Sequence, residues 1–236
     1  MHIPNGLLDP KIATGSAFAA AAVLGYCIAK VKQALVAAVP EAVLAGIGNV
    51  TATVKGGIGK AAENHFVKMG AIGALIFAGQ MFNFPVAEGT SGHLLGGIIA
   101  AVALGPFSGA IVIAAVLFVQ SIFFADGGIM VLGANILNMA IIGSFACYYI
   151  YYNIYNAMKN KYGFYLSVGL AAFSSVLIAS IACSLEIAWS GTVNLGIVLP
   201  AMASVHAVIG ISEALITIMA LEILRSLKFD LEGEIK

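Results

Sequence analysis

The chain has 236 residues, of which 61% are hydrophobic and 9% are charged, and its formal net charge is zero. Soluble domains carry about a quarter charged residues, so this composition excludes a soluble protein and predicts an integral membrane protein. The balanced charge gives no indication of nucleic-acid binding. Three cysteines lie singly in apolar stretches, which predicts buried thiols and not disulfides or thiolate ligands.

Hydropathy predicts an all-α fold, an integral-membrane bundle of about seven transmembrane helices, since about 20 apolar residues cross a bilayer. The third helix is short and should begin inside the membrane or be shielded by protein, which favours a buried, non-helical loop at 84–92. Gly105-Pro106 predicts a tight turn directly after it. The predicted ranges are 12–33, 66–83, 92–104, 107–124, 131–155, 164–185 and 199–224.

Residues 35–65 fit neither a span nor a free linker, because Pro40, several glycines and lysines interrupt the apolar residues. We expect an atypical interfacial or cytoplasmic hairpin here, within a single integral-membrane domain that covers residues 1–236. Gly56-Gly57-Ile58-Gly59-Lys60 lacks the first glycine of a phosphate loop, and Ala61 follows the lysine in place of Ser or Thr. The segment therefore predicts no ATPase activity in this chain.

Basic residues favour one orientation in the membrane. With the N-terminus outside, ten of the eleven Lys and Arg residues lie on the cytoplasmic side and only Lys11 opposes the bias. The C-terminus is then cytoplasmic. The N-terminus and the loops at 84–92, 125–130 and 186–198 share the outer face, where an arriving substrate meets them first.

The first two residues form a potential metal chelator. Residues 1–10 contain no Lys or Arg, unlike a signal peptide, so we expect the N-terminus to persist. The Met1 amine, the His2 amide nitrogen and the His2 imidazole can close two rings around a tetragonal ion, most naturally nickel or copper, with cobalt also possible. His93 follows the outer loop at 84–92 and can supply a fourth nitrogen, whereas His65 is expected to be a wet interfacial residue.

Three motifs in this order resemble the CbiM/NikM family, the substrate-binding membrane subunits of energy-coupling-factor (ECF) transporters for cobalt and nickel. They are MHIPNG at 1–6, NFPVAEGTSGHLLGG at 83–97, and FADGG at 124–128 followed by LGAN at 132–135 and Asn138-Met139. Members of the family usually carry Asp where this chain has Asn5. They also have a much shorter connection after the first helix, which leaves the role of residues 35–65 open.

The resemblance implies a seven-helix bundle with the N-terminus inserted into it, where Met1, His2 and His93 bind one Co²⁺ or Ni²⁺ ion as transported substrate, without a cofactor. It also implies partners in the prokaryotic plasma membrane: a transmembrane coupling subunit, two ABC ATPase subunits and often a small accessory membrane protein. The chain itself would then be a multi-pass transport subunit and not an enzyme. The residues implied as support for the site are Asn83 and Ser91 around the loop, and Asn135 and Asn138, which could equally be a helix-packing pair.

His206 and Glu213 are seven residues apart and share one face of the last predicted helix. Together they match the family pattern His-x-x-Ile-Gly-Ile-x-Glu-Ala, and we favour a structural hydrogen-bond network over a second metal site. Asp126 fits a turn and helix-capping carboxylate better than a role in metal entry.

A self-sufficient secondary carrier or channel is the alternative function. Such proteins usually place several ionisable groups deep in their spans, whereas Glu213 is nearly alone here. An intramembrane metalloprotease is disfavoured because no His-Glu-x-x-His motif occurs. Four nitrogens and the general affinity order favour nickel, but cobalt stays open because cells also select metals by availability.

Overall fold

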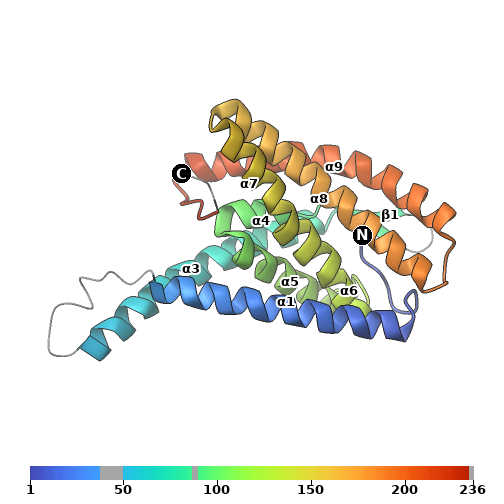
Figure 1. The fold of residues 1–236 in the computed structure, drawn as a ribbon, viewed down its shortest axis with the longest axis horizontal. Helices are drawn as coiled ribbons and strands as arrows, with labels where there is room; N and C mark the ends of the chain where they lie inside the picture. The colour runs from blue at the N-terminus through green and yellow to red at the C-terminus, as the bar shows by residue number, and fades with distance from the viewer. Residues whose placement is uncertain (38–49, 87–89, 234–236) are drawn as a thin grey trace.

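The computed structural model describes residues 1–37, 50–86 and 90–233. In Figure 1, α1 and α9 run along opposite sides of a helical bundle, with α4, α5 and the run from α6 to α7 between them. The elements in chain order are α1 (Pro10–Ala37), α3 (Val50–Gln80), β1 (Asn83–Val86), β2 (Thr90–His93), α4 (Gly97–Leu104), α5 (Pro106–Phe123), the 3-10 turn η2 (Ile129–Val131), α6 (Leu132–Ile136), the π-helix η3 (Leu137–Ala146), α7 (Cys147–Met158), α8 (Lys161–Trp189) and α9 (Leu195–Ser226).

Five helical stretches of the described residues are long and apolar enough to cross a membrane. This confirms the prediction of a helical membrane protein. The stretches are α1, α5, the continuous run Ile129–Met158, α8 and α9.

Two predicted helices differ from the structure by more than a few residues at their ends. The range 66–83 is wrong at its start, because α3 begins at Val50 and runs unbroken to Gln80. Hydropathy depends on side chains, and Lys55 and Lys60 lower it without preventing a helical backbone. The predicted hairpin at 35–65 is therefore partly helix, and residues 38–49 lie outside the described part of the chain. The range 131–155 is not one regular α-helix, because α6 leads into the π-helical turns of η3.

The third helix is short and surrounded by protein, as predicted. All eight residues of α4 are buried, and α4 packs against α5 and η3. Gly105, at φ +82°, turns the chain into Pro106 at the start of α5. A Cβ on Gly109 would stand 2.8 Å from the Ala101 backbone, so the glycine permits close helix approach.

The loop before α4 is a hairpin. β1 and β2 pair antiparallel, with the backbone of Asn83 opposite that of His93. The prediction of a non-helical segment is confirmed for the described residues. They form two short strands in place of the expected loop. Residues 87–89 lie outside the described part.

The C-terminal segment returns to the bundle and covers the end of α4. The amides of Glu232 and Gly233 donate to the carbonyls of Ala103 and Val102, at 3.1 and 3.0 Å. The Tyr148 hydroxyl donates to the Gly233 carbonyl at 2.7 Å. The two bonds to Ala103 and Val102 satisfy carbonyl groups that α4 leaves open at its C-terminus.

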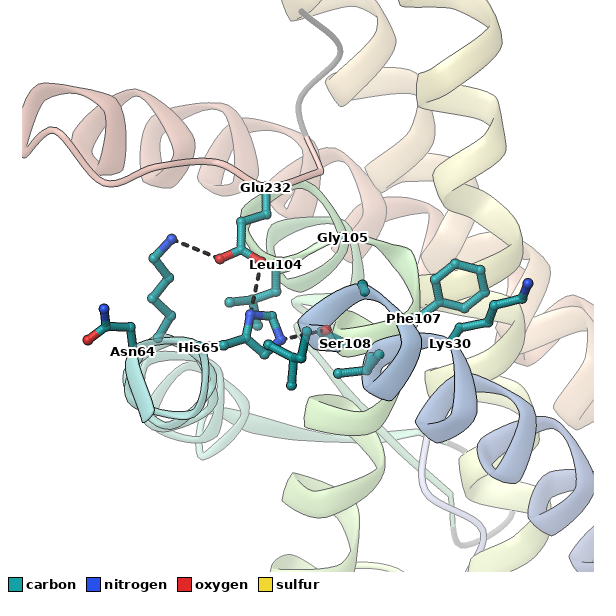
Figure 2. Close-up of a pocket in the computed structure, with 12 residues that line it drawn as sticks. Lys30, Asn64, His65, Leu104, Gly105, Phe107, Ser108 and Glu232 are labelled. Atoms are coloured by element: carbon teal, nitrogen blue, oxygen red, sulfur yellow. Dashed lines mark hydrogen bonds and ion pairs between the residues drawn. The ribbon is translucent and has the colours of Figure 1, made fainter. Parts of the chain in front are cut away.

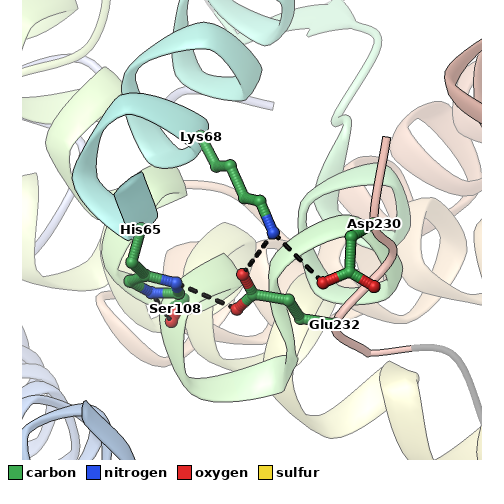
Figure 3. Close-up of polar contacts among 5 residues, drawn as sticks. All are labelled: His65, Lys68, Ser108, Asp230 and Glu232. Carbon is green, nitrogen blue, oxygen red and sulfur yellow. Dashed lines mark hydrogen bonds and ion pairs between the residues drawn. The ribbon is translucent and has the colours of Figure 1, made fainter. Parts of the chain in front are cut away.

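Figure 3 shows the ion-pair cluster that this segment forms with α3. The Glu232 carboxylate lies 2.9 Å from His65 Nδ1 and 2.8 Å from Lys68 Nζ. His65 Nε2 lies 2.9 Å from Ser108 Oγ. These groups line a cavity of about 430 Å³, with Lys30 on its α1 side (Figure 2). The prediction of a wet His65 is wrong, because the distant C-terminal segment folds over it and leaves it buried.

Candidate metal site

The first three residues lie inside the bundle, beside α8 (Figure 1). Met1 and Ile3 are 0% exposed and His2 is 3% exposed. Asn135 holds the backbone of Ile3 in both directions: its Oδ1 accepts from the Ile3 amide at 2.8 Å and its Nδ2 donates to the Ile3 carbonyl at 3.1 Å. The Gly128 amide also donates to that carbonyl, at 2.9 Å. We call residues 1–5 the arm. The hydrogen bonds of the Ile3 backbone fix how far the arm enters the bundle.

Two adjacent glycines make room for the arm. Gly127 has φ +86°, and a Cβ there would stand 2.5 Å from His2 Nδ1. A Cβ on Gly128 would overlap the amide of Asn5. Asn5 Oδ1 accepts from the Met130 amide at 3.0 Å. An Asp at position 5 would offer the same acceptor atom, so the departure from the family pattern preserves this contact.

His93 lies at the end of β2 with a ring that is 0% exposed. Its Nδ1 is 2.6 Å from the Leu94 carbonyl, which can only accept a hydrogen bond. Nδ1 must therefore carry the proton, and Nε2 keeps a lone pair. Among the described residues Nε2 has no hydrogen-bond partner. The rings of His93 and His2 are 4.6 Å apart between centroids. A buried lone pair without a donor suits a metal cation.

Burial keeps these nitrogens unprotonated. It lowers the pKa of the Met1 amine from 8.0 to about 5, although Cys183 and Asp126 raise it. Burial and the nearby amine lower the pKa of His2 to about 3. The same two causes, in that order, hold the pKa of His93 well below its ordinary value. At neutral pH all three groups therefore present lone pairs without first losing a proton.

Side chains alone do not form a metal centre in this region. Within the described part of the chain, no three His, Cys, Asp or Glu side chains are grouped to hold a metal. A four-nitrogen set around His2 and His93 thus needs atoms of the main chain. The Met1 amine and the His2 amide are the main-chain nitrogens of the arm that can complete it.

The predicted supporting residues separate into different roles. Asn135 binds the arm, as described above. Asn138 has a different partner, because its Nδ2 donates to Glu186 Oε2 on α8 at 2.6 Å. Asp126 Oδ2 lies 3.9 Å from His2 Nε2, beside the arm. The side chains of Asn83 and Ser91 lie outside the described part of the structure.

His206 and Glu213 are both buried on α9, but no hydrogen bond joins them in the described residues. His206 Nδ1 lies 2.8 Å from the Met202 carbonyl. Glu213 instead binds the backbone that follows His93, with Oε2 accepting from the Leu95 amide at 2.8 Å and Oε1 from the Gly96 amide at 2.7 Å. The favoured structural network is thus present for Glu213, with other partners than expected.

Two buried polar residues near the site escaped prediction. Glu186 was assigned to an outer loop, whereas α8 extends to Trp189 and buries it. Gln80, the last residue of α3, donates from Nε2 to the Leu95 carbonyl at 2.6 Å. The sequence shows each of them only as a polar residue at the edge of an apolar stretch. That signal does not identify the residue to which its side chain binds.

Comparison with known proteins gives consistent matches. A family model described as "Cobalt uptake substrate-specific transmembrane region" matches residues 36–231. A relative from Archaeoglobus fulgidus, whose name assigns it to nickel transport as a fused NikMN protein, is 36% identical over 219 residues. That alignment covers 92% of this chain and 63% of the relative, so the chain spans less than two thirds of the relative's length. The cobalt transport protein CbiM of Acetoanaerobium sticklandii is 37% identical over 120 residues, 51% of this chain and 48% of its own.

Two solved structures share the fold. The crystal structure of a transition metal transporter superposes with a TM-score of 0.79 at 27% identity, covering 98% of this chain and 95% of the other. A truncated transition metal transporter gives 0.76 at 28% identity, covering 97% and 99%. The matches confirm the predicted multi-pass transmembrane protein. The chain therefore belongs to the CbiM family of cobalt uptake substrate-specific transmembrane proteins.

Proposed function

We propose that this chain binds one Ni²⁺ or Co²⁺ ion as the substrate-specific subunit of an ECF-type importer. The Met1 amine, the His2 amide and imidazole, and His93 Nε2 are the proposed donors. The single observation that carries this proposal is the buried, unpartnered Nε2 of His93, whose ring faces His2 on the inserted arm. The two nickel- and cobalt-transport relatives support the choice of metals.

The proposed membrane orientation has the N-terminus outside and the C-terminus in the cytoplasm, in one domain over residues 1–236. It rests on the positions of the Lys and Arg residues in the sequence. The ion then enters from the face that carries the arm, the hairpin and the Gly127-Gly128 turn. Asn83 and Ser91 are proposed to brace the hairpin next to His93.

Energy for uptake is proposed to come from a transmembrane coupling subunit and two ABC ATPases, with a small accessory membrane protein in some assemblies. The family's description as a substrate-specific region supports this division of labour. A self-sufficient carrier is the alternative. Vesicles that contain this chain alone should neither accumulate metal nor carry a metal-dependent proton flux, whereas a self-sufficient carrier would do so.

His93→Ala tests the proposed site directly. Loss of one of four donors should weaken Ni²⁺ and Co²⁺ binding at least ~100-fold, since removal of even an outer-shell partner costs about 10- to 100-fold. His65→Ala is the matched control, because His65 is also buried but lies in the ion-pair cluster beside the C-terminal segment. Titration calorimetry on the purified proteins measures the effect, and equal affinity of His93→Ala and the parent protein would overturn the assignment.

A further inference from the structure

Glu213 is an acidic residue in the middle of an apolar helix and is 1% exposed. An acid at this depth is costly unless its oxygens are satisfied. Both oxygens accept from consecutive backbone amides, those of Leu95 and Gly96. These amides immediately precede α4, where helix geometry concentrates unpaired N–H groups and partial positive charge.

The segment that Glu213 contacts is also held from α3. Gln80 donates to the Leu95 carbonyl at 2.6 Å. Gly96 has φ +72°, and a Cβ there would stand 2.8 Å from Ile76. Buried side chains of α3 and α9 thus contact the backbone between β2 and α4 from two sides.

One peptide group connects Glu213 with His93. The bond between Leu94 and Leu95 belongs to a rigid plane whose C=O and N–H point in opposite directions. Its oxygen accepts from His93 Nδ1 at 2.6 Å, and its N–H donates to Glu213 at 2.8 Å. Rotation of this plane would break both hydrogen bonds together. The Glu213 carboxylate therefore fixes the direction of the carbonyl that selects the His93 tautomer.

We propose that Glu213 is a positioning residue for metal binding, which holds His93 Nε2 toward the arm through the Leu94–Leu95 peptide plane. The inference rests on the proposed function, in which His93 is a ligand. Glu213 does not touch the ion. It acts as the carboxylates behind metal-binding histidines do, with a peptide group placed between carboxylate and ring.

The test compares Glu213→Gln and Glu213→Ala with Thr217→Ala. Thr217 is the matched control, because it is buried one turn further along α9 and its hydroxyl has no partner among the described residues. Glu213→Ala should weaken Ni²⁺ binding about 10- to 100-fold, the range of outer-shell losses. Glu213→Gln should fall between Ala and the parent, because it keeps one acceptor and turns an N–H toward the other amide. Thr217→Ala should bind normally.

A purely structural role is separated by spectroscopy and by a mutant cycle. Electron paramagnetic resonance of the Cu²⁺-loaded proteins should show four nitrogen couplings in the parent and a weakened or lost coupling in the Glu213 variants. In a His93→Ala background, Glu213→Gln should cause no further loss of affinity. Lower melting temperature with unchanged affinity and spectrum, or additive losses in the cycle, would overturn the inference.

The outcomes also distinguish this inference from the proposed function. Normal binding by His93→Ala removes the proposed site itself. Loss of binding in His93→Ala together with normal binding in Glu213→Gln leaves the site standing and removes only the positioning role. If Glu213→Ala fails to fold, the Gln variant and the cycle still give a result.

Discussion

The number of protons released on metal binding reports how deeply the arm is buried before the ion arrives. With a pKa of about 5, the Met1 amine is about 1% protonated at pH 7, whereas an exposed amine with a pKa near 8 is about 90% protonated. His2, with a pKa of about 3, and His93, with a pKa well below its ordinary value, are also neutral. Only the His2 amide then has a proton to lose, so we expect about one proton per ion.

Titration calorimetry of Ni²⁺ into the detergent-solubilised protein measures this number, when the heat is compared across buffers of different ionisation enthalpy at pH 7. The sign of the pH dependence follows from the same groups. Binding releases the proton of the His2 amide, so affinity falls as pH decreases, about tenfold per pH unit between pH 6 and 8. The fall in affinity becomes steeper below about pH 5, where protons begin to compete with the metal for the Met1 amine.

The result that would refute this reasoning is release of two or more protons at pH 7. That number would mean that Met1 is solvated and protonated before binding. The arm would then dock only with the ion.

Gly127→Ala should abolish high-affinity binding, because its Cβ would displace the His2 ring. Gly191→Ala is the control, because Gly191 also has a positive φ, +71° against +86° at Gly127, but has open space around it. Equal affinity of both variants would contradict the role of Gly127 in making room for His2. A single Gly added before Met1 should weaken binding at least ~100-fold, because the amine becomes a peptide nitrogen and the pocket around Met1 is closed. Calorimetry on the intact extended protein, verified by mass spectrometry, decides this. Ni²⁺ bound by four nitrogens in a plane should be diamagnetic, and a paramagnetic loaded protein would exclude that donor set.

Features encoded in local sequence were predictable. The apolar segment before Gly105-Pro106 is too short to span a bilayer, and it forms the buried α4. The proximity of His2 and His93 was predicted from their shared outer face, from the vacant fourth position of the chelate and from the family motifs, and the structure brings their rings to 4.6 Å between centroids.

Features that depend on distant partners were not predictable. Asn138 and Glu186 are 48 positions apart, and Leu95 and Glu213 are 118 positions apart, so neither pairing has a local signature. The same holds for His65, which is buried by the C-terminal segment. The π-helical turns of η3 retain an apolar pattern like that of an α-helix, and hydropathy does not separate the two.

The buried arm has a consequence for how long an ion stays bound. In the proposed site, three of the four donor atoms belong to the first two residues, and the arm is tied down one residue later by Asn135 and Gly128. The chelate and the arm therefore move as one unit. Departure of the ion requires withdrawal of the arm or successive rupture of adjacent chelate bonds. The residence time in the isolated protein is then set by local unfolding of the N-terminus, and rapid discharge requires a partner that accelerates this opening.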